Sequence, residues 1–414
     1  MNSSQMDSIE AWCPRGLVVN GADVLSAPTT ADGLCPLRIT WEKNKISRIE
    51  VINESSKSPL RLLLPRLVEP HAHLDKVFTW RSFPNLSGTY KGALEANLQE
   101  HQKRTSNVVR SRSEKALQIA LKNGLRSIRS HVDSFGLKGT ESLEVLIDLK
   151  KEWNSLIDLQ IVAMVPLDYW SSGEGKLLAT RVATSGGLLG GIIVPPFRNK
   201  KSYIDLMELL NLANRLNCGV DLHIDESDKY PADGLKQLIK VLDNIEINIP
   251  ITCSHASSMG MLPSKELHCL AEKLAHYQVN VVALPLTNAW LLGHQVNATP
   301  IKRPLAPLKQ LQQAGVNVAV GGDNVQDPWF PLGNLDPISL MSFSMPLTQL
   351  SPWERLGLSP FTTSAAVLLG LEWDGTIQIG SPADFILLQA SSWTEALSNS
   401  PSREILIRGK WFQK

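Results

Sequence analysis

Eight short runs of apolar and β-branched residues, separated by longer segments rich in helix formers, constrain the fold of this chain most strongly. Parallel strands need a long connection between them, and that connection is usually a helix. Eight such strands match a closed, TIM-like (β/α)8 barrel, whereas an open doubly wound sheet does not need eight and stays the alternative. The expected strands end at His73, Asp133, Val165, Val194, Asp225, Ser257, Leu286 and Asp323.

Both ends of the chain have a different pattern. Residues 16–52 and 375–414 contain short alternating segments with turn residues between them, such as LRITWEKN and ADFILLQ. Alternation of apolar and polar residues indicates half-buried strands of an antiparallel sheet. We therefore expect an α/β protein in which a catalytic barrel, residues 66–370, is flanked by a small β-sandwich domain built from residues 1–65 and 371–414.

The charge balance argues against a polyanionic partner. The 414 residues include 41 basic and 40 acidic side chains, a net charge of +1, so nothing favours nucleic acid or an anionic membrane surface. No apolar run approaches the roughly 18 residues that span a bilayer, and the N-terminal segment has no basic region followed by an apolar one. We expect a cytoplasmic protein, without nucleic-acid or membrane partners, that acts on a small molecule.

Five polar residues at the ends of the expected strands are candidates for a metal site. His71 and His73 lie two positions apart, so the period of a strand points both side chains into the barrel. His223, His255 and Asp323 each interrupt an apolar run later in the chain. The intervals from His71 onward, 152, 32 and 68 residues, fit four, one and two barrel units of about 31 residues or slightly more. The five residues therefore belong after strands one, five, six and eight, at the rim where barrel enzymes hold their active sites.

This set of side chains suits metal-assisted hydrolysis. Taken singly, a buried histidine is usually a hydrogen-bonded core residue, and an aspartate after a strand is often a helix cap, but five coincident strand ends fit those interpretations poorly. Imidazole nitrogens and a carboxylate are ligands of Zn²⁺ or Fe²⁺, which can lower the pKa of a bound water to about 7. Glu226, three residues after His223, is placed to move a proton from that water to a substrate nitrogen.

The same residues lie in motifs that resemble the cytosine deaminase-like branch of the amidohydrolase superfamily over nearly the whole chain. The motifs are VEPHAHLDK, IRSHVD, DLHIDE, TCSHAS and GGDNVQDPWFPLG. The resemblance implies a catalytic role for Asp323, for Glu226 as the acid and base, and for His255, which would hydrogen-bond a metal-bound hydroxide. It implies one divalent ion per chain, Fe²⁺ or Zn²⁺, held by His71, His73, His223 and Asp323. Binuclear relatives use a lysine directly after the fourth strand, whereas the nearest lysine here, Lys200, lies well past it.

Departures from the family pattern concern the substrate. Cytosine deaminases carry a glutamine after the third strand, where this chain has Leu167 and Asp168, so we expect cytosine to be a poor substrate and these two residues to contact another one. Asn324 replaces a second aspartate of the family, and an amide both donates and accepts hydrogen bonds, which indicates a different recognised group. Trp329 is expected to form a wall of the pocket.

Three functions are compatible with these features. The first is hydrolytic deamination of a nitrogen heterocycle other than cytosine. The second uses the same machinery to hydrolyse a cyclic amide or an N-alkylamino substituent, so that only the leaving group differs. The third is a catalytically silent binding protein, which is disfavoured because every ligand and the acid/base residue are present. Barrel enzymes of this kind commonly form homo-oligomers, although no segment shows which surface would be used.

Overall fold

The computed structural model describes residues 7–19, 27–52, 59–193, 195–197 and 199–412. The chain divides into two compact units. The terminal unit comprises Met1–Val68, Ala120–Arg126 and Asp336–Lys414, and the barrel unit comprises Glu69–Ile119 and Ser127–Leu335. None of the described helices is long and apolar enough to cross a membrane.

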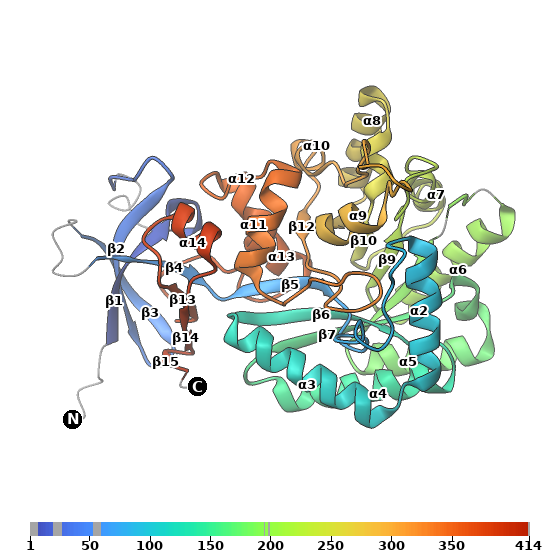
Figure 1. Ribbon diagram of the computed structural model, residues 1–414, viewed down its shortest axis with the longest axis horizontal. Coiled ribbons are helices and arrows are strands. Elements are labelled where there is room, and N and C mark those ends of the chain that lie inside the picture. Colours follow the sequence, from blue (N-terminus) through green and yellow to red (C-terminus); the bar gives the residue numbers. More distant parts are fainter. Residues whose placement is uncertain (1–6, 20–26, 53–58, 194, 198, 413–414) are drawn as a thin grey trace. The chain divides into compact units, whose positions relative to one another are not determined.

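Eight parallel strands pair in sequence order in one sheet (Figure 1). A bridge between Ala72 and Asp323, with the backbone N–H of Asp323 donating to the carbonyl of His71 at 2.9 Å, joins the last strand to the first. The expected (β/α)8 barrel is thereby confirmed as a nearly closed eight-stranded barrel. The strands are β5 (Leu67–Ala72), β6 (Leu125–Asp133), β7 (Asp158–Val165), β8 (Leu188–Ile193), β9 (Val220–Ile224), β10 (Ile251–His255), β11 (Asn280–Ala283) and β12 (Val318–Val320).

Five strands, β5 and β9 to β12, end one to three residues earlier than the sequence pattern predicts. Asp225 and His255 have left-handed backbones, with φ of 57° and 74°, which end the extended conformation of β9 and β10. Asp323, with φ of 63°, lies three residues past the end of β12. After β11, the segment Pro285–Leu291 begins a helix instead of prolonging the strand. Val194, the expected end of the fourth strand, lies outside the described residues.

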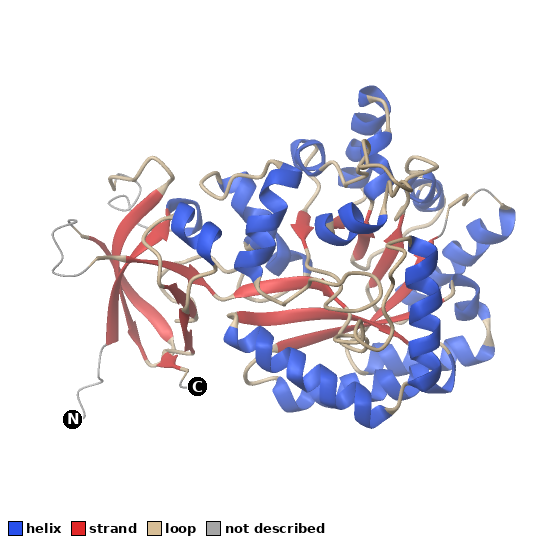
Figure 2. Cartoon of the chain, in the orientation of Figure 1, coloured by secondary structure: helices blue, strands red, loops and turns tan. Residues whose placement is uncertain are grey.

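Helices follow the strands and surround them (Figure 2). One helix, α2, is an addition between β5 and the helix that leads into β6. The helices of the barrel are α2 (Tyr90–Lys103), α3 (Ser106–Lys122), α4 (Gly136–Trp153), α5 (Gly173–Thr184), α6 (Lys200–Arg215), α7 (Asp233–Leu242), α8 (Ser264–His276), α9 (Pro285–Leu291) and α10 (Leu308–Gln313), with short 3-10 turns η2 (Leu167–Ser171) and η3 (Ser257–Met261).

Strands from both ends of the chain form the separate β domain that the sequence predicts. They make one mostly antiparallel sheet of seven strands instead of two stacked sheets, with β1 and β4 as a parallel pair. An apolar cluster that includes Trp41, Leu63 and Phe385 fills this domain. The strands are β1 (Asp7–Pro14), β2 (Leu34–Glu42), β3 (Lys45–Val51), β4 (Arg61–Pro65), β13 (Phe385–Leu388), β14 (Arg403–Ile407) and β15 (Lys410–Trp411).

Residues 336–370, which we expected in the barrel domain, group with the terminal unit. Two polar contacts tie them to the C-terminal segment: an ion pair of 2.7 Å between Arg403 and Asp336, and a hydrogen bond from Ser342 to the carbonyl of Leu397. The helices of the whole terminal unit are α11 (Pro337–Thr348), α12 (Arg355–Leu358), α13 (Thr363–Leu368) and α14 (Trp393–Asn399), with the 3-10 turns η1 (Arg15–Leu17) and η4 (Ser359–Phe361).

Candidate metal centre

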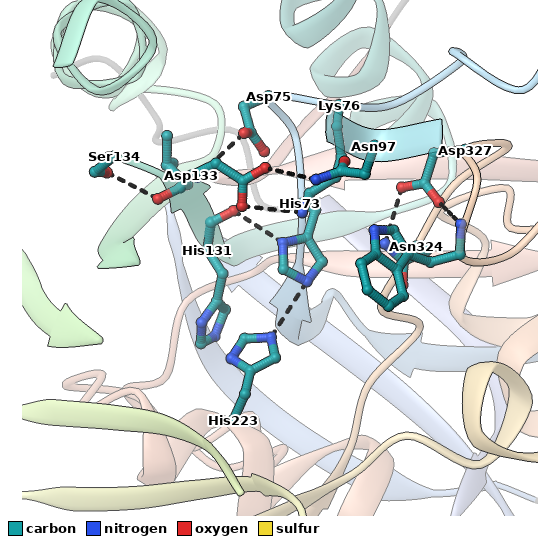
Figure 3. Close-up of polar contacts among 12 residues, drawn as sticks. His73, Asp75, Lys76, Asn97, His131, Asp133, Ser134, His223, Asn324 and Asp327 are labelled. Atoms are coloured by element: carbon teal, nitrogen blue, oxygen red, sulfur yellow. Dashed lines mark hydrogen bonds and ion pairs between the residues drawn. The ribbon is translucent and has the colours of Figure 1, made fainter. Parts of the chain in front are cut away.

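The five polar residues expected at the strand ends converge at one end of the barrel, and all are buried. Nε2 of His73 lies 3.2 Å from Oδ1 of Asp323 and 3.4 Å from Nε2 of His223. Nε2 of His71 lies 3.6 Å from the same Asp323 oxygen. Figure 3 shows the rings of His73 and His223 with their nitrogens facing one another. The centre therefore brings together side chains from β5, β9 and the segment after β12.

Several polar atoms of this candidate centre have no hydrogen-bond partner among the described residues. They include Nε2 of His71, Nε2 of His255 and both carboxylate oxygens of Asp323. Burial lowers the pKa of His71 and of His223 well below the usual range, so both rings are neutral and keep a lone pair. A buried polar atom without a partner costs about 1–3 kcal/mol. Converging lone pairs of this kind fit a divalent cation, and His71, His73 and Asp323 offer atoms within 4.8 Å of one another.

Hydrogen bonds behind the rings fix their orientation. Nδ1 of His71 lies 2.9 Å from the hydroxyl of Ser254, which donates to Oδ1 of Asp221 at 2.8 Å. Nδ1 of His73 donates to the backbone carbonyl of His131 at 3.1 Å. Bonds at Nδ1 leave Nε2 of each ring for a metal. Asp221 was not among the residues expected at the site. Its position two residues before His223, which points both side chains to the same face of β9, is a sequence signal that could have identified it.

Glu226 and His255 lie side by side next to this centre. Oε1 of Glu226 is 3.6 Å from Nδ1 of His255, and the amide nitrogen of Asn288 is 3.0 Å from the same Nδ1. Burial, together with the charge of Asp323, raises the pKa of Glu226 well above its usual range. Burial lowers the pKa of His255 to about 4. Left-handed backbones at His255 and Asp323 place both side chains, as often happens at functional sites.

A family model described as "Amidohydrolase family" matches residues 190–410. A pterin deaminase of Rhizobium rhizogenes is 31% identical over 359 residues, which cover 86% of this chain and 82% of the relative. The chain belongs to the amidohydrolase family. An N-isopropylammelide isopropyl amidohydrolase of Pseudomonas sp. is 24% identical, with 84% of each chain covered.

A solved structure has the same fold. The 5-methylcytosine deaminase of Klebsiella pneumoniae liganded with phosphonocytosine has a TM-score of 0.81 and 26% identity, covering 99% of this chain and 98% of that one. The relatives are deaminases and amidohydrolases, so the expected family and the expected enzyme class, a hydrolase of carbon–nitrogen bonds, are confirmed.

A pocket of about 500 Å³ adjoins the candidate metal centre. Its polar residues are His73, Lys76, Asn97, His101, Asp133, His223, Glu226, His255, Asp323 and Asn324. Its other walls are apolar or aromatic, formed by Tyr90, Leu94, Leu98, Phe135, Met164, Val165, Pro166, Leu167, Ile192 and Trp329. A large apolar pocket with a few polar groups at one place is typical of small-molecule sites.

Three of the four expected substrate contacts line this pocket, and Asp168 does not. Leu167 is buried against the pocket, whereas Asp168 is exposed and pairs with Lys201 at 2.9 Å. The 3-10 turn η2 begins after a single residue, Pro166, that follows β7, so the side chains of Leu167 and Asp168 point in different directions and Asp168 reaches solvent. In this structure Asp168 therefore lies away from the pocket, and its role as a substrate contact stays a prediction.

Asp327 orients Asn324 and Trp329, the other two expected substrate contacts that line the pocket. Its Oδ2 accepts a hydrogen bond from the amide nitrogen of Asn324 at 2.8 Å, and its Oδ1 accepts one from the backbone of Trp329 at 2.9 Å. Because Asp327 engages the Asn324 donor, the amide turns its carbonyl oxygen away from that carboxylate. Tyr90 of α2 packs edge-on against Trp329 with ring centroids 5.0 Å apart, a wall residue that sequence reasoning missed.

Proposed function

We propose that this amidohydrolase deaminates an amino-substituted nitrogen heterocycle by hydrolysis, with a bicyclic, pterin-like ring as the preferred substrate. The observation that carries the reaction type is the set of converging, unpartnered lone pairs beside Glu226, in the same pocket. The preference for a bicyclic ring is supported by the pterin deaminase relative and by a pocket of about 500 Å³.

The donor set of His71, His73, His223 and Asp323 fits one divalent ion, Fe²⁺ or Zn²⁺. When bound, such an ion supplies the Lewis acidity that makes water a nucleophile near neutral pH. The silent-protein alternative is disfavoured by this complete set. The expected cytoplasmic location and homo-oligomeric state stay predictions.

Glu226 is the residue that transfers protons in the proposed reaction. Its buried carboxylate, with a raised pKa, is a stronger base than a solvated one and accepts a proton from the attacking water. The same carboxyl then delivers the proton to the ring nitrogen or the departing amino group, and ammonia leaves. Asn288 donates to Nδ1 of His255, which leaves the ring proton on Nε2, so His255 is a hydrogen-bond donor to the attacking oxygen.

Loss of an alkylamine in place of ammonia is the second candidate. The N-isopropylammelide isopropyl amidohydrolase relative favours it, because its name describes removal of an N-alkyl amine. The residues that move protons would be the same in either reaction. Separate assays for ammonia and for isopropylamine distinguish the two.

The test is a release assay on purified protein loaded with Zn²⁺ or Fe²⁺. We expect ammonia from pterin, and much slower release from cytosine, because the third strand lacks the glutamine of cytosine deaminases and unmatched polar edges in a closed site cost about 10⁴ in rate or more. Cytosine turnover equal to that of pterin would contradict the preference. A loaded protein that releases no amine from any amino heterocycle would refute the reaction type.

A further inference from the structure

Helix α2 presents one face to the pocket. Its lining residues follow helical spacing along that face: Tyr90, Leu94, Asn97, Leu98 and His101. Asn97 stands out on this face, because an amide in the middle of a helix has a low helix propensity and this one is buried, with 8% of the residue exposed. Its neighbours on the buried side of the helix are Ala93, Ala96 and Glu100. The burial of Asn97 therefore calls for a specific partner.

Asp133 fixes which way the Asn97 amide points. The amide nitrogen donates to Oδ2 of Asp133 at 3.4 Å (Figure 3). Lys76 lies 3.1 Å from Oδ1 of this carboxylate, and Arg104 lies 3.5 Å from Oδ2. Although burial opposes it, the charges of Lys76 and Arg104 lower the pKa of Asp133, so the group is ionised and can only accept hydrogen bonds. The amide must therefore turn its NH₂ to Asp133 and its carbonyl oxygen away.

That carbonyl oxygen has no partner. Oδ1 of Asn97 is buried and makes no hydrogen bond to any described residue. Buried acceptors are nearly always satisfied, and Asn97 is one of the residues that line the pocket, so a bound ligand can supply the partner that the protein does not. The group that would satisfy it is an N–H donor, because an amide oxygen accepts and does not donate.

We propose that Asn97 is a specificity-determining residue whose Oδ1 accepts a hydrogen bond from a ring N–H of the heterocycle. The proposal rests on the proposed function and narrows it to amino heterocycles that carry a lactam- or ureide-type ring N–H in addition to the amino group that is lost. Asp133 acts through Asn97 as a positioning residue, with Lys76 and Arg104 holding its charge.

The experiment measures binding of deaminated product analogues, so it does not depend on turnover. Lumazine, xanthine and uracil, which all carry ureide N–H groups, and their N-methyl derivatives are titrated into the Zn²⁺-loaded protein by calorimetry. The variant is Asn97→Leu, which keeps the approximate size and favours the helix. Gln99→Leu, the same loss of an amide at an exposed position of α2, is the control.

We expect Asn97→Leu to weaken binding of the best N–H ligand by roughly 10- to 100-fold, because a buried hydrogen bond is lost. The N-methyl derivative that removes the contacted N–H should bind the parent equally weakly and lose no further affinity in the variant. Gln99→Leu should match the parent, and metal content and thermal unfolding of Asn97→Leu should be unchanged.

Three outcomes would overturn the proposal. Asn97→Leu could bind the ligand within threefold of the parent, it could weaken all derivatives equally, or the parent could bind none of these compounds. Tight binding that depends on Asn97, in a protein that releases no ammonia from any substrate, would support the recognition role while refuting the proposed reaction.

Discussion

The barrel unit contains two clusters of buried polar residues, the metal centre and a cluster around Arg104. They differ in whether their polar atoms have partners within the protein. In the metal centre, Nε2 of His71 and the oxygens of Asp323 have no hydrogen-bond partner. In the second cluster, Arg104 pairs with Asp75 at 2.7 Å and with Glu100, while Arg112 binds the other oxygen of Glu100 at 2.7 Å.

The difference separates a structural cluster from a functional one. Buried charges that pair with opposite charges stabilise the fold, and removing one partner leaves the other charge buried without a counter-charge. Buried lone pairs that converge on one point are costly until a cation binds. Mutations in the Arg104 cluster should therefore reduce stability, and mutations in the metal centre should reduce metal binding and activity.

The largest effect is expected for His223→Ala, which removes one ligand of a small set. Metal content, measured by elemental analysis after dialysis, should fall from about one ion per chain to none, and activity should disappear. The control is His268→Ala, because His268 is exposed on α8 and its hydrogen bonds to described residues go to Ser264 of the same helix. Full metal content in His223→Ala would remove this residue from the ligand set, and two tightly bound ions per parent chain would overturn the mononuclear assignment.

Glu226→Gln should keep the metal and lose catalysis. The amide preserves size and hydrogen bonding but cannot shuttle a proton, and such transfer contributes about 10²–10⁴ in rate. Steady-state rates with metal content measured on the same samples give the result, and product analogues should bind the variant as they bind the parent. Glu272→Gln, at an exposed position of α8, is the control. Activity within a few-fold of the parent would show that another group carries the proton.

Arg104→Met should test the paired cluster. Removing the guanidinium leaves Asp75 and Glu100 buried without their main partner, which should lower the free energy of unfolding by about 3–5 kcal/mol. Urea denaturation measures this loss, with Lys91→Met as control because its pair with Glu95 on the same helix is exposed. Unchanged stability together with lost metal would reverse the roles of the two clusters.

Metal removal should have the smallest effect on folding. An ion at about 100 times its dissociation constant stabilises the native state by about 2.7 kcal/mol, so chelation should lower the free energy of unfolding of the parent by roughly that amount. The same chelator should leave His223→Ala unaffected. Equal destabilisation of both proteins would mean that the stabilising ion binds elsewhere.

Local patterns in the sequence determined the barrel and most of the metal centre. Apolar runs of strand length gave eight parallel strands, and period-two spacing put His71 and His73 on one face. The intervals to His223, His255 and Asp323 matched whole barrel units, so their meeting could be predicted without coordinates. Strand periodicity and unit length are local properties, which is why they can be read from the sequence.

The tertiary structure decided what surrounds the metal centre. Asp168 turned outward because η2 begins one residue after β7, and Tyr90 and Asn97 entered the pocket from α2, a helix outside the regular βα repeat. Residues 336–370 joined the terminal unit through contacts with segments far away in sequence. Loop direction and the packing of an added helix depend on contacts between distant residues, and no periodicity in the sequence encodes those contacts.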